Sequence, residues 1–454
     1  MTPIPLLATP EDYSLLTDLY QLTMASCYAG EGVADRIASF ELFTRRLPAN
    51  YGYLVAMGLA QAVDYLRNLR FSERHLEALQ QTGLFDQAPD GFWQRLKDGA
   101  FTGDLWAVPE GTAVFANEPL LRVEAPLWQA QIAETYLLNT LNYQTLVATR
   151  AARLRDVAGP AAKLLEFGSR RAFSPQGALW AARAALAAGL DDTSNVLAAV
   201  QLGRKPAGTM AHALVMVFAA LEGSEDSAFE AFHRYFPGAA LLIDTYDTVA
   251  AAERLAARVQ QGQSQVASVR LDSGNLVALS QAVRSHLPDT KIFASGDLDE
   301  YEIARLRAAG AKIDGYGLGT KLVTGDPVNG VYKLVEIDGI AVMKESSGKV
   351  TLPGRKQIFR RHEQGRAVGD RLGLMTDTPA PDEQPLLELV IKQGEVVRGE
   401  EKLAAIAART AASVASLPDA VRQIEQPTDY SVDLSDALVD LAARTRRSVA
   451  PPQL

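Results

Sequence analysis

Two hydrophobic periods alternate along the second third of this 454-residue chain. Apolar runs rich in β-branched residues, such as 265–271 and 290–295, have the composition of strands buried on both faces. Helical spacing marks Thr248 to Val259, Leu276 to Leu287 and Asp299 to Ala309. Strands that alternate with helices predict a parallel sheet, and this many units favour a closed or nearly closed β/α barrel.

The residues that follow each strand candidate carry the chemistry of this region. The candidates end at Phe167, Leu202, Thr209, Asp244, Asp272, Ser295 and Gly317. The segments at these ends read, in chain order, GSRR, LG, GTMAH, DTYDT, RLDSGN, SGDLDE and GYGLGT. In a barrel the carboxyl ends of the strands meet at one rim, which is where such enzymes place their catalytic groups. Turns alone do not explain so many ends of this composition, so we expect a functional rim.

The pattern changes on both sides of the barrel and predicts further domains. We expect an N-terminal α/β domain, a β/α-barrel domain, a β-rich segment that completes the N-terminal domain, and a C-terminal helical extension, at residues 1–135, 136–328, 329–400 and 401–454 respectively. Turn signals at Asp338-Gly339 and Ser347-Gly348 divide the β-rich segment into short strands.

Several elements are predicted in the N-terminal part. Helical spacing covers Ser14 to Tyr28, with Thr17-Asp18 as its cap, and it also covers Leu59 to Leu69. Ile37 to Arg45 alternates like a strand. A long helix from Gln129 to Val157 leads into the barrel.

Charge and cysteine content exclude several classes of protein. The net charge is −9, so we expect neither nucleic acid nor a membrane surface as a partner. Cys27 is the single cysteine, which excludes an internal disulfide and fits a reducing compartment. The N-terminus does not resemble a secretory signal, and no apolar run reaches the length of a membrane span. These features predict a cytoplasmic protein.

Anion-binding residues are concentrated at the predicted rim. Arg170 and Arg171 are adjacent at a strand end, where burial is costly unless an anion meets them. Arg270 and Asp272 are two residues apart and share one side of a strand, either as a grip on a phosphosugar or as a buried ion pair. Asp244 is a further rim candidate, whereas Asp247 precedes a helix as a cap.

His212 is the histidine whose sequence context fits a reactive group. Beside phosphate sites, it is a candidate phosphoryl acceptor or general acid and base. The glycines of GYGLGT and of SGD allow backbone N–H groups to approach a phosphate. No cluster has the ligand spacing of a zinc site, so we expect no protein-bound metal and instead Mg²⁺ delivered with a polyphosphate.

Eight motifs in register resemble those of nicotinate phosphoribosyltransferases, over roughly residues 12 to 360. They are TDLYQLTM, EFGSRR, GTMAH, DTYDT, RLDSGN, SGDLDE, GYGLGT and LPGRKQ. The resemblance implies an α/β fold of the type II phosphoribosyltransferases. This fold has an irregular β/α barrel, an N-terminal α/β sandwich domain completed by later chain, and a C-terminal helical tail.

The same resemblance implies a reaction. Nicotinate is joined to 5-phosphoribosyl-1-pyrophosphate (PRPP) to give nicotinate mononucleotide and pyrophosphate, a step of NAD salvage, and ATP hydrolysis drives it through a phosphohistidine. Mg²⁺ accompanies ATP and PRPP as substrates, and no tightly bound cofactor is expected. A homodimer with shared active sites is implied.

Residue roles follow from position within the motifs. His212 resembles the phosphorylated histidine, with Thr209 in its loop. Arg170 resembles the residue that holds the nicotinate carboxylate, and Phe167 the aromatic beside it. Tyr20 resembles the aromatic that stacks on the ring from the partner subunit.

The phosphoribosyl half of the site is assigned in the same way. Arg270 and Asp272, together with His212, are the expected catalytic residues. The remaining substrate-binding candidates are Asp244, Ser295, Gly296, Asp297, Gly317, Gly319 and Thr320. Further candidates to assist a polyphosphate are Lys344, Arg355 and Lys356.

Two positions bear on the choice of substrate. Asn275, as in some nicotinamide-specific relatives, ends the motif RLDSGN where the family usually has an acidic residue. Ser194 stands where nicotinamide enzymes have an acidic residue, so with Arg170 and Arg171 it favours an acid ring over an amide. Asp191 and Asp192 lie close by. A nicotinamide phosphoribosyltransferase and a non-catalytic, nucleotide-binding regulatory barrel are the alternatives.

Overall fold

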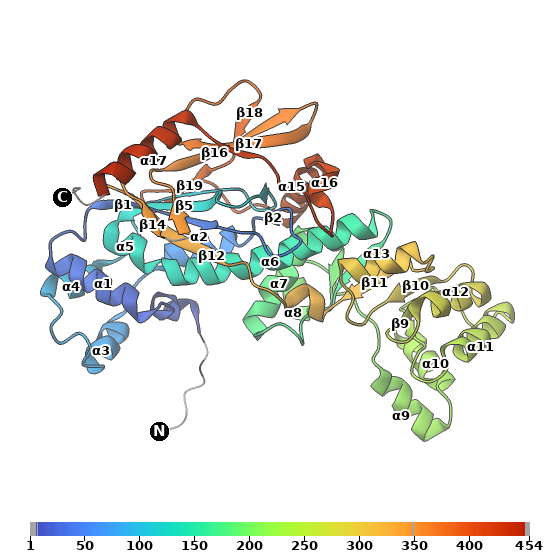
Figure 1. The fold of residues 1–454 in the computed structure, drawn as a ribbon. Helices are drawn as coiled ribbons and strands as arrows, with labels where there is room; N and C mark the ends of the chain where they lie inside the picture. The colour runs from blue at the N-terminus through green and yellow to red at the C-terminus, as the bar shows by residue number, and fades with distance from the viewer. Residues whose placement is uncertain (1–5, 7, 347–348, 450–454) are drawn as a thin grey trace. The chain divides into compact units, whose positions relative to one another are not determined.

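The structure is a computed structural model and describes residue 6, residues 8–346 and residues 349–449. The chain forms two compact units. Unit 1 contains residues 1–146 and 327–454, and unit 2 contains residues 147–326. The long helix predicted between them is present as α6 (Glu134–Ala158), preceded by the short helix α5 (Leu127–Ile132) (Figure 1).

A seven-stranded antiparallel sheet organises unit 1. Its strands are, in sheet order, β13 (Ile340–Ala341), β12 (Gly330–Ile337), β1 (Ile37–Thr44), β5 (Pro119–Pro126), β3 (Asp104–Ala107), β19 (Glu388–Lys392) and β20 (Glu395–Val396). Strand β12 pairs with β1, and β19 pairs with β3. Later chain therefore completes the N-terminal domain, as predicted.

Helices cover the N-terminal part of unit 1. They are the 3-10 helix η1 (Pro10–Leu15) and the helices α1 (Leu19–Gly30), α2 (Leu59–Asn68), α3 (Glu73–Gln81) and α4 (Asp90–Asp98). The helix predicted from Ser14 thus begins later, at Leu19. Asp18 occupies its N-cap position, but its side chain makes no capping hydrogen bond.

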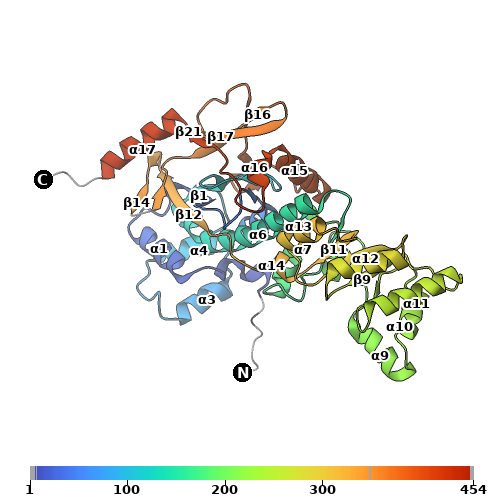
Figure 2. The same ribbon diagram turned by 45° about the vertical axis from the view of Figure 1, so that its right-hand side comes forward.

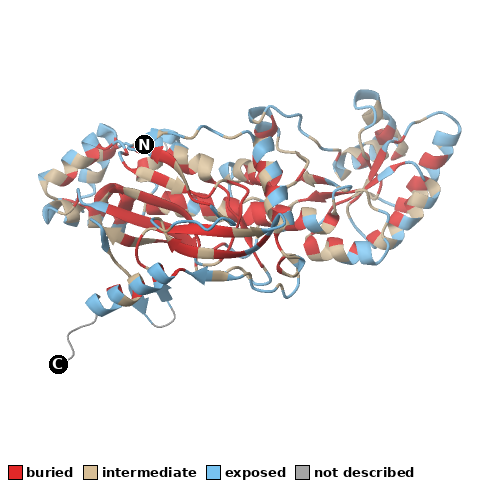
Figure 3. Cartoon of the chain, turned by 90° about the horizontal axis from the view of Figure 1, so that it is seen from above, coloured by how far each residue is buried: buried red, intermediate tan, exposed pale blue. Residues whose placement is uncertain are grey.

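Strand β1 is buried on both faces, although its sequence alternates between apolar and polar residues. The reason is Glu41, which is fully buried and accepts a 2.8 Å hydrogen bond from the backbone N–H of Lys356. Its carboxylate also lies 2.8 Å from Nζ of Lys356. A polar residue on this strand thus points into protein rather than solvent. Figure 3 colours the chain by burial, and its long strands are drawn mostly in red.

A smaller sheet and the C-terminal helices complete unit 1. The sheet order is β18 (Glu383–Pro385), β16 (Lys356–Glu363), β17 (Arg366–Leu374) and β21 (Val432–Leu434). The helices are α15 (Leu403–Ser416), α16 (Asp419–Arg422) and α17 (Asp436–Val449). Two further two-stranded pairs are β2 (Leu54–Val55) with β4 (Ala113–Val114), and β14 (Lys344–Ser346) with β15 (Lys349–Thr351).

The predicted turns of the β-rich segment have different outcomes. Asp338 and Gly339 both have positive φ, at 46° and 75°, and they join β12 to β13 as predicted. The predicted turn at Ser347-Gly348 lies outside the described residues.

Unit 2 is a parallel sheet with helices between its strands. The strands, in sheet order, are β7 (Asp192–Thr193), β6 (Lys163–Glu166), β11 (Gly315–Leu318), β10 (Lys291–Ala294), β9 (Ser268–Leu271) and β8 (Leu241–Leu242). Every one of these pairings is parallel. The predicted fold class, α/β with an irregular barrel-like domain, is confirmed.

The helices of unit 2 include all those that periodicity predicted. They are α7 (Pro175–Ala187), α8 (Val196–Gln201), α9 (His212–Glu222), α10 (Asp226–Tyr235), α11 (Thr248–Gln260), α12 (Leu276–His286), α13 (Glu300–Ala308) and α14 (Thr320–Val323). Helices α9 and α10 pack against each other, as do α11 and α12 (Figure 2).

Two predicted strands of unit 2 are wrong. The apolar run ending at Leu202 is helix α8, because the Asn195 side chain accepts a hydrogen bond from the Ala198 N–H and caps a helix there. The run ending at Thr209 has no regular structure. The sheet strand in this region is instead β7, which was too short and too polar for its pattern to reveal it.

Candidate active site

The carboxyl ends of the unit 2 strands surround an open cleft of about 980 Å³. Because the strands are parallel, the segments that follow them emerge at one edge of the sheet. Most of the predicted site residues line this cleft: Phe167, Arg170, Thr209, His212, Arg270, Asp272, Ser295, Gly296, Asp297, Gly317, Gly319 and Thr320. The volume is sufficient for a ligand larger than a single ring.

Arg270 stands on β9 and points a guanidinium without a protein partner toward this cleft. Its Nε is shielded from solvent and has no hydrogen-bond acceptor. Burial lowers the pKa of Arg270 from its usual value, while the nearby carboxylates of Asp272 and Asp244 oppose that shift. Within the described residues it forms no ion pair, so the buried-pair alternative does not hold, and an anion would satisfy it.

Arg170 and Arg171 follow β6 in a tight turn. The carbonyl of Gly168 accepts hydrogen bonds from the backbone N–H groups of Arg171, at 2.8 Å, and Ala172, at 3.0 Å. Both arginines line the cleft, and among the residues that the structure describes neither guanidinium is ion-paired. The positive charge of Arg170 contributes to the lowered pKa of Arg270, so the cationic groups act on a common space.

His212 is the first residue of α9 rather than the end of a strand. Its Nδ1 lies 3.0 Å from the Thr245 hydroxyl. Its Nε2 lies 4.0 Å from a carboxylate oxygen of Asp272. The side chain is 39% exposed, so one face of the imidazole is open to the cleft. This arrangement orients the ring while leaving it accessible for proton or phosphoryl transfer.

Asp272 is held in place by its neighbours. The Ser295 hydroxyl donates to its Oδ1, and its backbone N–H donates to Asp244 at 2.7 Å. The same Asp244 oxygen accepts from the Ser273 hydroxyl at 2.9 Å. Asp244 therefore shapes the turn after β9 and does not line the cleft itself. Ser295 likewise acts through Asp272.

Glycines bring the backbone close to the cleft at two strand ends. Gly296 has φ +95°, and an added Cβ would lie 2.4 Å from the Asp272 carbonyl oxygen. Asp297 follows with φ +46°, an uncommon conformation for a side chain other than glycine. At Gly317 a Cβ would collide with the Phe167 ring at 2.5 Å, so this glycine makes room for the aromatic side chain.

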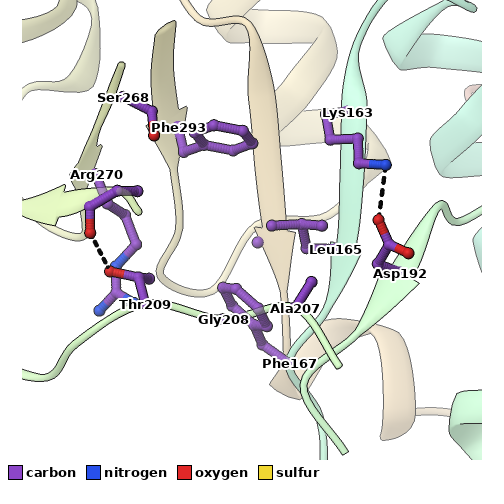
Figure 4. Close-up of a pocket in the computed structure, with 12 residues that line it drawn as sticks. Lys163, Leu165, Phe167, Asp192, Ala207, Gly208, Thr209, Ser268, Arg270 and Phe293 are labelled. Atoms are coloured by element: carbon purple, nitrogen blue, oxygen red, sulfur yellow. Dashed lines mark hydrogen bonds and ion pairs between the residues drawn. The ribbon is translucent and has the colours of Figure 1, made fainter. Parts of the chain in front are cut away.

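A smaller chamber of about 200 Å³ continues from the cleft into the sheet interior (Figure 4). Phe167, Leu165 and Phe293 form much of its apolar wall. The Thr209 hydroxyl donates to the Ala240 carbonyl at 2.6 Å, so it anchors its own segment rather than remaining free for a ligand.

Ser194 lines the cleft, whereas the neighbouring acidic side chains are engaged elsewhere. Asp191 accepts from the Arg155 guanidinium at 2.7 Å, and Asp192 pairs with Lys163 at 2.7 Å. Of these three residues, Ser194 lines the cleft and Asp192 lines the smaller chamber.

Asn275 caps helix α12. Its side-chain oxygen accepts from the Ala278 N–H at 3.3 Å. This cap gives Asn275 a structural role, which an acidic residue could fill equally well. Asp247 caps α11 as predicted, accepting from Val249 and Ala250.

Tyr20 belongs to unit 1 and is not part of the unit 2 cleft. It is 47% exposed on α1. Partial burial and the nearby carboxylate of Glu134 raise the pKa of Tyr20 to about 12, so the phenol stays neutral. Its stacking role remains a prediction.

The three basic residues of the β-rich segment differ in their surroundings. Lys356 is 2% exposed, and its ammonium pairs with Glu41 and donates to backbone carbonyls. Arg355 pairs with Glu124 at 3.1 Å. Lys344 is exposed on β14. For Lys356 the predicted contact with a polyphosphate does not fit, because the buried charge is already satisfied.

Sequence reasoning missed several residues of the cleft. Thr245 lies beside the cleft and contacts the imidazole of His212. It belongs to the motif DTYDT, but nothing in the sequence singled it out from the other residues of that motif. Phe232 and Phe236 form an apolar wall from α10 and the residue after it. Their spacing of four residues is a helical signal, but nothing in the sequence relates it to a cleft.

In the described part of the chain, no group of three or more His, Cys, Asp or Glu side chains is arranged to hold a metal ion. None of the described helices combines the length and apolarity needed to cross a bilayer.

Fold and cleft together define an α/β enzyme architecture with a cationic, anion-binding site at the carboxyl ends of parallel strands. Family models support a narrower assignment. The nicotinate phosphoribosyltransferase N-terminal domain matches residues 15–142, the nicotinate phosphoribosyltransferase family matches residues 162–349, and the nicotinate phosphoribosyltransferase C-terminal domain matches residues 381–442.

Individual relatives agree over nearly the whole chain. Similarity to a nicotinate phosphoribosyltransferase of Mycobacterium tuberculosis is 40% identity, covering 96% of this chain and 94% of the relative. The Bacillus subtilis enzyme of that name is 39% identical, with 94% of each chain covered. The crystal structure of human nicotinic acid phosphoribosyltransferase superposes with a TM-score of 0.81 at 30% identity, covering 96% of this chain and 100% of the human one. This chain belongs to the nicotinate phosphoribosyltransferase family.

Proposed function

We propose that this protein joins nicotinate to PRPP and drives the reaction with ATP through a phosphohistidine at His212. The observation that carries the proposal is the set of unpaired guanidiniums of Arg170, Arg171 and Arg270 beside an accessible histidine in one cleft. Membership of the nicotinate phosphoribosyltransferase family supports it. The product, nicotinate mononucleotide, places the enzyme in NAD biosynthesis.

The cleft has separate parts for the two organic substrates. Arg170 binds the nicotinate carboxylate, with Phe167 beside the ring. Arg270 and Asp272 bind the phosphoribosyl group, and the turn at Gly296 and Asp297 contacts ribose. The backbone at Gly317 and Gly319, with Thr320, contacts the phosphate. Positioning of this kind supplies much of the rate of a glycosyl transfer.

The chemistry requires charge stabilisation more than a protein nucleophile at carbon. The ring nitrogen of nicotinate bonds to ribose C1 as the C1–O bond to pyrophosphate breaks, and the electron pair leaves with the pyrophosphate oxygen. Arg270 stabilises the anionic side of this transition state. Separately, His212 takes the terminal phosphoryl group of ATP, releasing ADP, and the phosphohistidine is then hydrolysed.

Mg²⁺ enters with ATP and PRPP as part of the substrates, where it neutralises phosphate charge. Asp272 and Asp297 supply carboxylate oxygens of the kind that Mg²⁺ prefers. No tightly bound cofactor is proposed. The exposed thiol of Cys27, together with the absence of any other cysteine, fits a cytoplasmic enzyme.

The decisive assay uses the purified chain with nicotinate, PRPP and Mg²⁺, with and without ATP. We expect release of pyrophosphate together with nicotinate mononucleotide, faster with ATP present. Absence of pyrophosphate under both conditions contradicts the activity and leaves the regulatory-barrel alternative, which binds nucleotide without turnover. A His212→Ala variant should lose the stimulation by ATP, and retained stimulation excludes the phosphohistidine.

Nicotinamide is the alternative ring substrate, and Ser194 is the residue that argues against it. An acidic side chain there would favour an amide, whereas the serine leaves Arg170 and Arg171 without a competing carboxylate. Replacing nicotinate by nicotinamide in the same assay tests the choice. Equal kcat/KM for both rings contradicts acid selectivity.

A homodimer with shared sites is also proposed. Exposed apolar residues are concentrated on α8 and α9 beside the cleft: Val196, Leu197, Val200, Met216, Val217 and Leu221. Such exposure is costly for an isolated chain and favours burial against a second copy. Tyr20 is the residue expected to arrive from that copy.

Mixing two inactive variants tests the shared site. Tyr20→Ala should be inactive alone, and His212→Ala should show no ATP-stimulated activity alone. If Tyr20 acts across the interface, heterodimers contain one intact site, and an equal mixture recovers about a quarter of the ATP-stimulated activity of the wild type. A monomer by light scattering, or no recovery after confirmed subunit exchange, contradicts this arrangement.

A further inference from the structure

Glu166, the last residue of β6, is a buried carboxylate that joins two segments of the cleft. It is 1% exposed. One oxygen accepts a hydrogen bond from the backbone N–H of Gly168, and the other accepts from the Thr193 hydroxyl. Its backbone carbonyl accepts from the Ser194 N–H at 2.9 Å. A single residue thus holds both the turn that leads to Arg170 and the turn that contains Ser194.

The restraint extends beyond these first contacts. Thr193 accepts a 2.9 Å hydrogen bond from the Asn195 N–H, which begins helix α8. The carbonyl of Thr193 accepts from the Ala207 N–H at 2.8 Å, which fixes the start of the segment leading to His212. The Glu166 carboxylate therefore acts on these segments through Gly168 and Thr193, whereas the backbone hydrogen bonds of Glu166 and Thr193 do not depend on it.

Burying the Glu166 carboxylate costs folding free energy. Burial raises the pKa of Glu166, and the hydrogen bonds from Thr193 and Gly168 offset only part of that shift. In the described part of the chain no Lys or Arg pairs with it. An apolar residue would fill the same space at a lower cost in folding free energy. A buried, hydrogen-bonded polar group instead fixes the positions of the segments that it contacts.

We propose that Glu166 is a positioning residue for the acceptor ring, setting the separation of Arg170 and Ser194 and thereby the affinity and acid-over-amide selectivity of the ring site. The inference rests on the proposed function, because it concerns nicotinate. It predicts a defect confined to the ring half of the cleft. The phosphoribosyl half is held independently by the Asp244, Asp272 and Ser295 contacts.

Glu166→Gln tests the proposal with nearly unchanged shape. An amide has one acceptor oxygen. If that oxygen accepts from the Gly168 N–H, the amide NH2 group can only donate to the Thr193 hydroxyl, whose proton then loses its buried acceptor. We expect KM for nicotinate to rise roughly tenfold and the preference for nicotinate over nicotinamide to fall, as one buried hydrogen bond is lost. KM for PRPP should change less than about twofold.

Three further variants separate positioning from general weakening. Thr193→Val should reproduce the rise in KM for nicotinate. Thr193→Ser should keep the wild-type KM because the hydroxyl remains. Asp314→Asn is a control outside the cleft: Asp314 also accepts a strand N–H, that of Ile292 at 2.8 Å, but it pairs with Arg284 and does not line the cleft. This control should leave both KM values unchanged. Equal rises in both KM values in Glu166→Gln overturn the proposal.

Amide hydrogen exchange gives a readout that does not depend on turnover. Glu166→Gln should accelerate exchange in residues 168–172 and 193–196, and Asp314→Asn should not. Unchanged exchange in both segments overturns the positioning role even if kinetics change. If the wild-type chain shows no transferase activity, the proposed function fails, while the exchange result still decides whether Glu166 holds the two segments.

Discussion

The two units differ in whether their buried arginines have partners within the protein. In unit 1, the Arg360 guanidinium makes two hydrogen bonds to Asp370, at 2.9 and 2.6 Å, and lies over the rings of Phe115 and Tyr430. The Tyr430 hydroxyl donates to the same carboxylate at 3.2 Å. In unit 2, Arg270 is half-buried beside carboxylates, and within the described residues it forms no ion pair and its Nε has no hydrogen-bond partner.

The difference separates structural charge from functional charge. A buried pair whose hydrogen bonds are satisfied within the protein has no capacity left for a ligand. A guanidinium that is partly desolvated and unpaired retains that capacity, at some cost in folding free energy. By this criterion Arg360 and Lys356 belong to the scaffold of unit 1, whereas Arg270 has the properties expected of a ligand-binding residue.

The largest expected effect comes from breaking the closed pair. Arg360→Met leaves Asp370 buried without its cation beside Glu118, whose pKa is already raised by burial and by Asp370. We expect a loss of about 3–5 kcal/mol in the free energy of unfolding, measured by urea denaturation. The double variant Arg360→Met with Asp370→Leu should recover most of it. A loss below about 1 kcal/mol contradicts the structural role.

The open arginine should behave in the reverse way. Arg270→Ala is expected to lower kcat/KM roughly 10²- to 10³-fold, because a donor to the developing anion is removed. Its stability should stay the same or rise slightly, since an unsatisfied buried group is lost. Arg270→Lys keeps the charge but not the planar fork and should recover only part of the activity. A large loss of stability with little change in kcat/KM places Arg270 in the scaffold instead.

The sequence predicted most of unit 2 because its strands are short apolar runs with polar ends. Strands β9, β10 and β11 and helices α11 to α13 were readable on that basis alone. The run 196–202 was wrongly predicted as a strand. Several of its apolar residues are exposed on helix α8, and a short apolar run does not show by itself whether it is a buried strand or a helix with an exposed apolar face.

The site was predictable as far as motifs mark strand ends. That Arg270, Asp272 and Ser295 share a cleft follows from a parallel sheet. Which of them touches a ligand does not, since it depends on pairings across about 30 residues, such as Thr245 with His212 and Glu166 with Thr193. Hydrogen-bond partners at that separation have no signature in the local pattern.

A smaller effect is expected at the boundary between site and scaffold. Asn275→Ala removes the N-cap of α12 and should lower the free energy of unfolding by about 1 kcal/mol. Asn275→Asp restores a capping oxygen and should be close to wild type in stability. Thermal unfolding of the three proteins provides the measurement. A fall in activity without loss of stability in Asn275→Ala points to a direct role in the cleft.

The smallest effect is a pH dependence that separates buried from exposed carboxylates. Folding raises the pKa of Glu166 above its ordinary value of 4.5, chiefly through burial. The native state therefore binds the proton more tightly than the unfolded chain does. The resulting stability is fully present below pH 4.5 and is lost as pH rises through the raised pKa. Glu166→Gln has no such proton, so its Tm relative to wild type should increase from about pH 4 to about pH 7.

Glu302 is the matched control, because its exposed contact with Arg305 lowers its pKa. Stability from Glu302 is present above its ordinary pKa and is lost as pH falls through the lowered value. The Tm of Glu302→Gln relative to wild type should therefore decrease over the same rise in pH. Parallel trends for the two variants contradict the assignment of a desolvated carboxylate to Glu166. Opposite changes of relative Tm with pH distinguish the buried carboxylate of Glu166 from the exposed carboxylate of Glu302 on a helix surface.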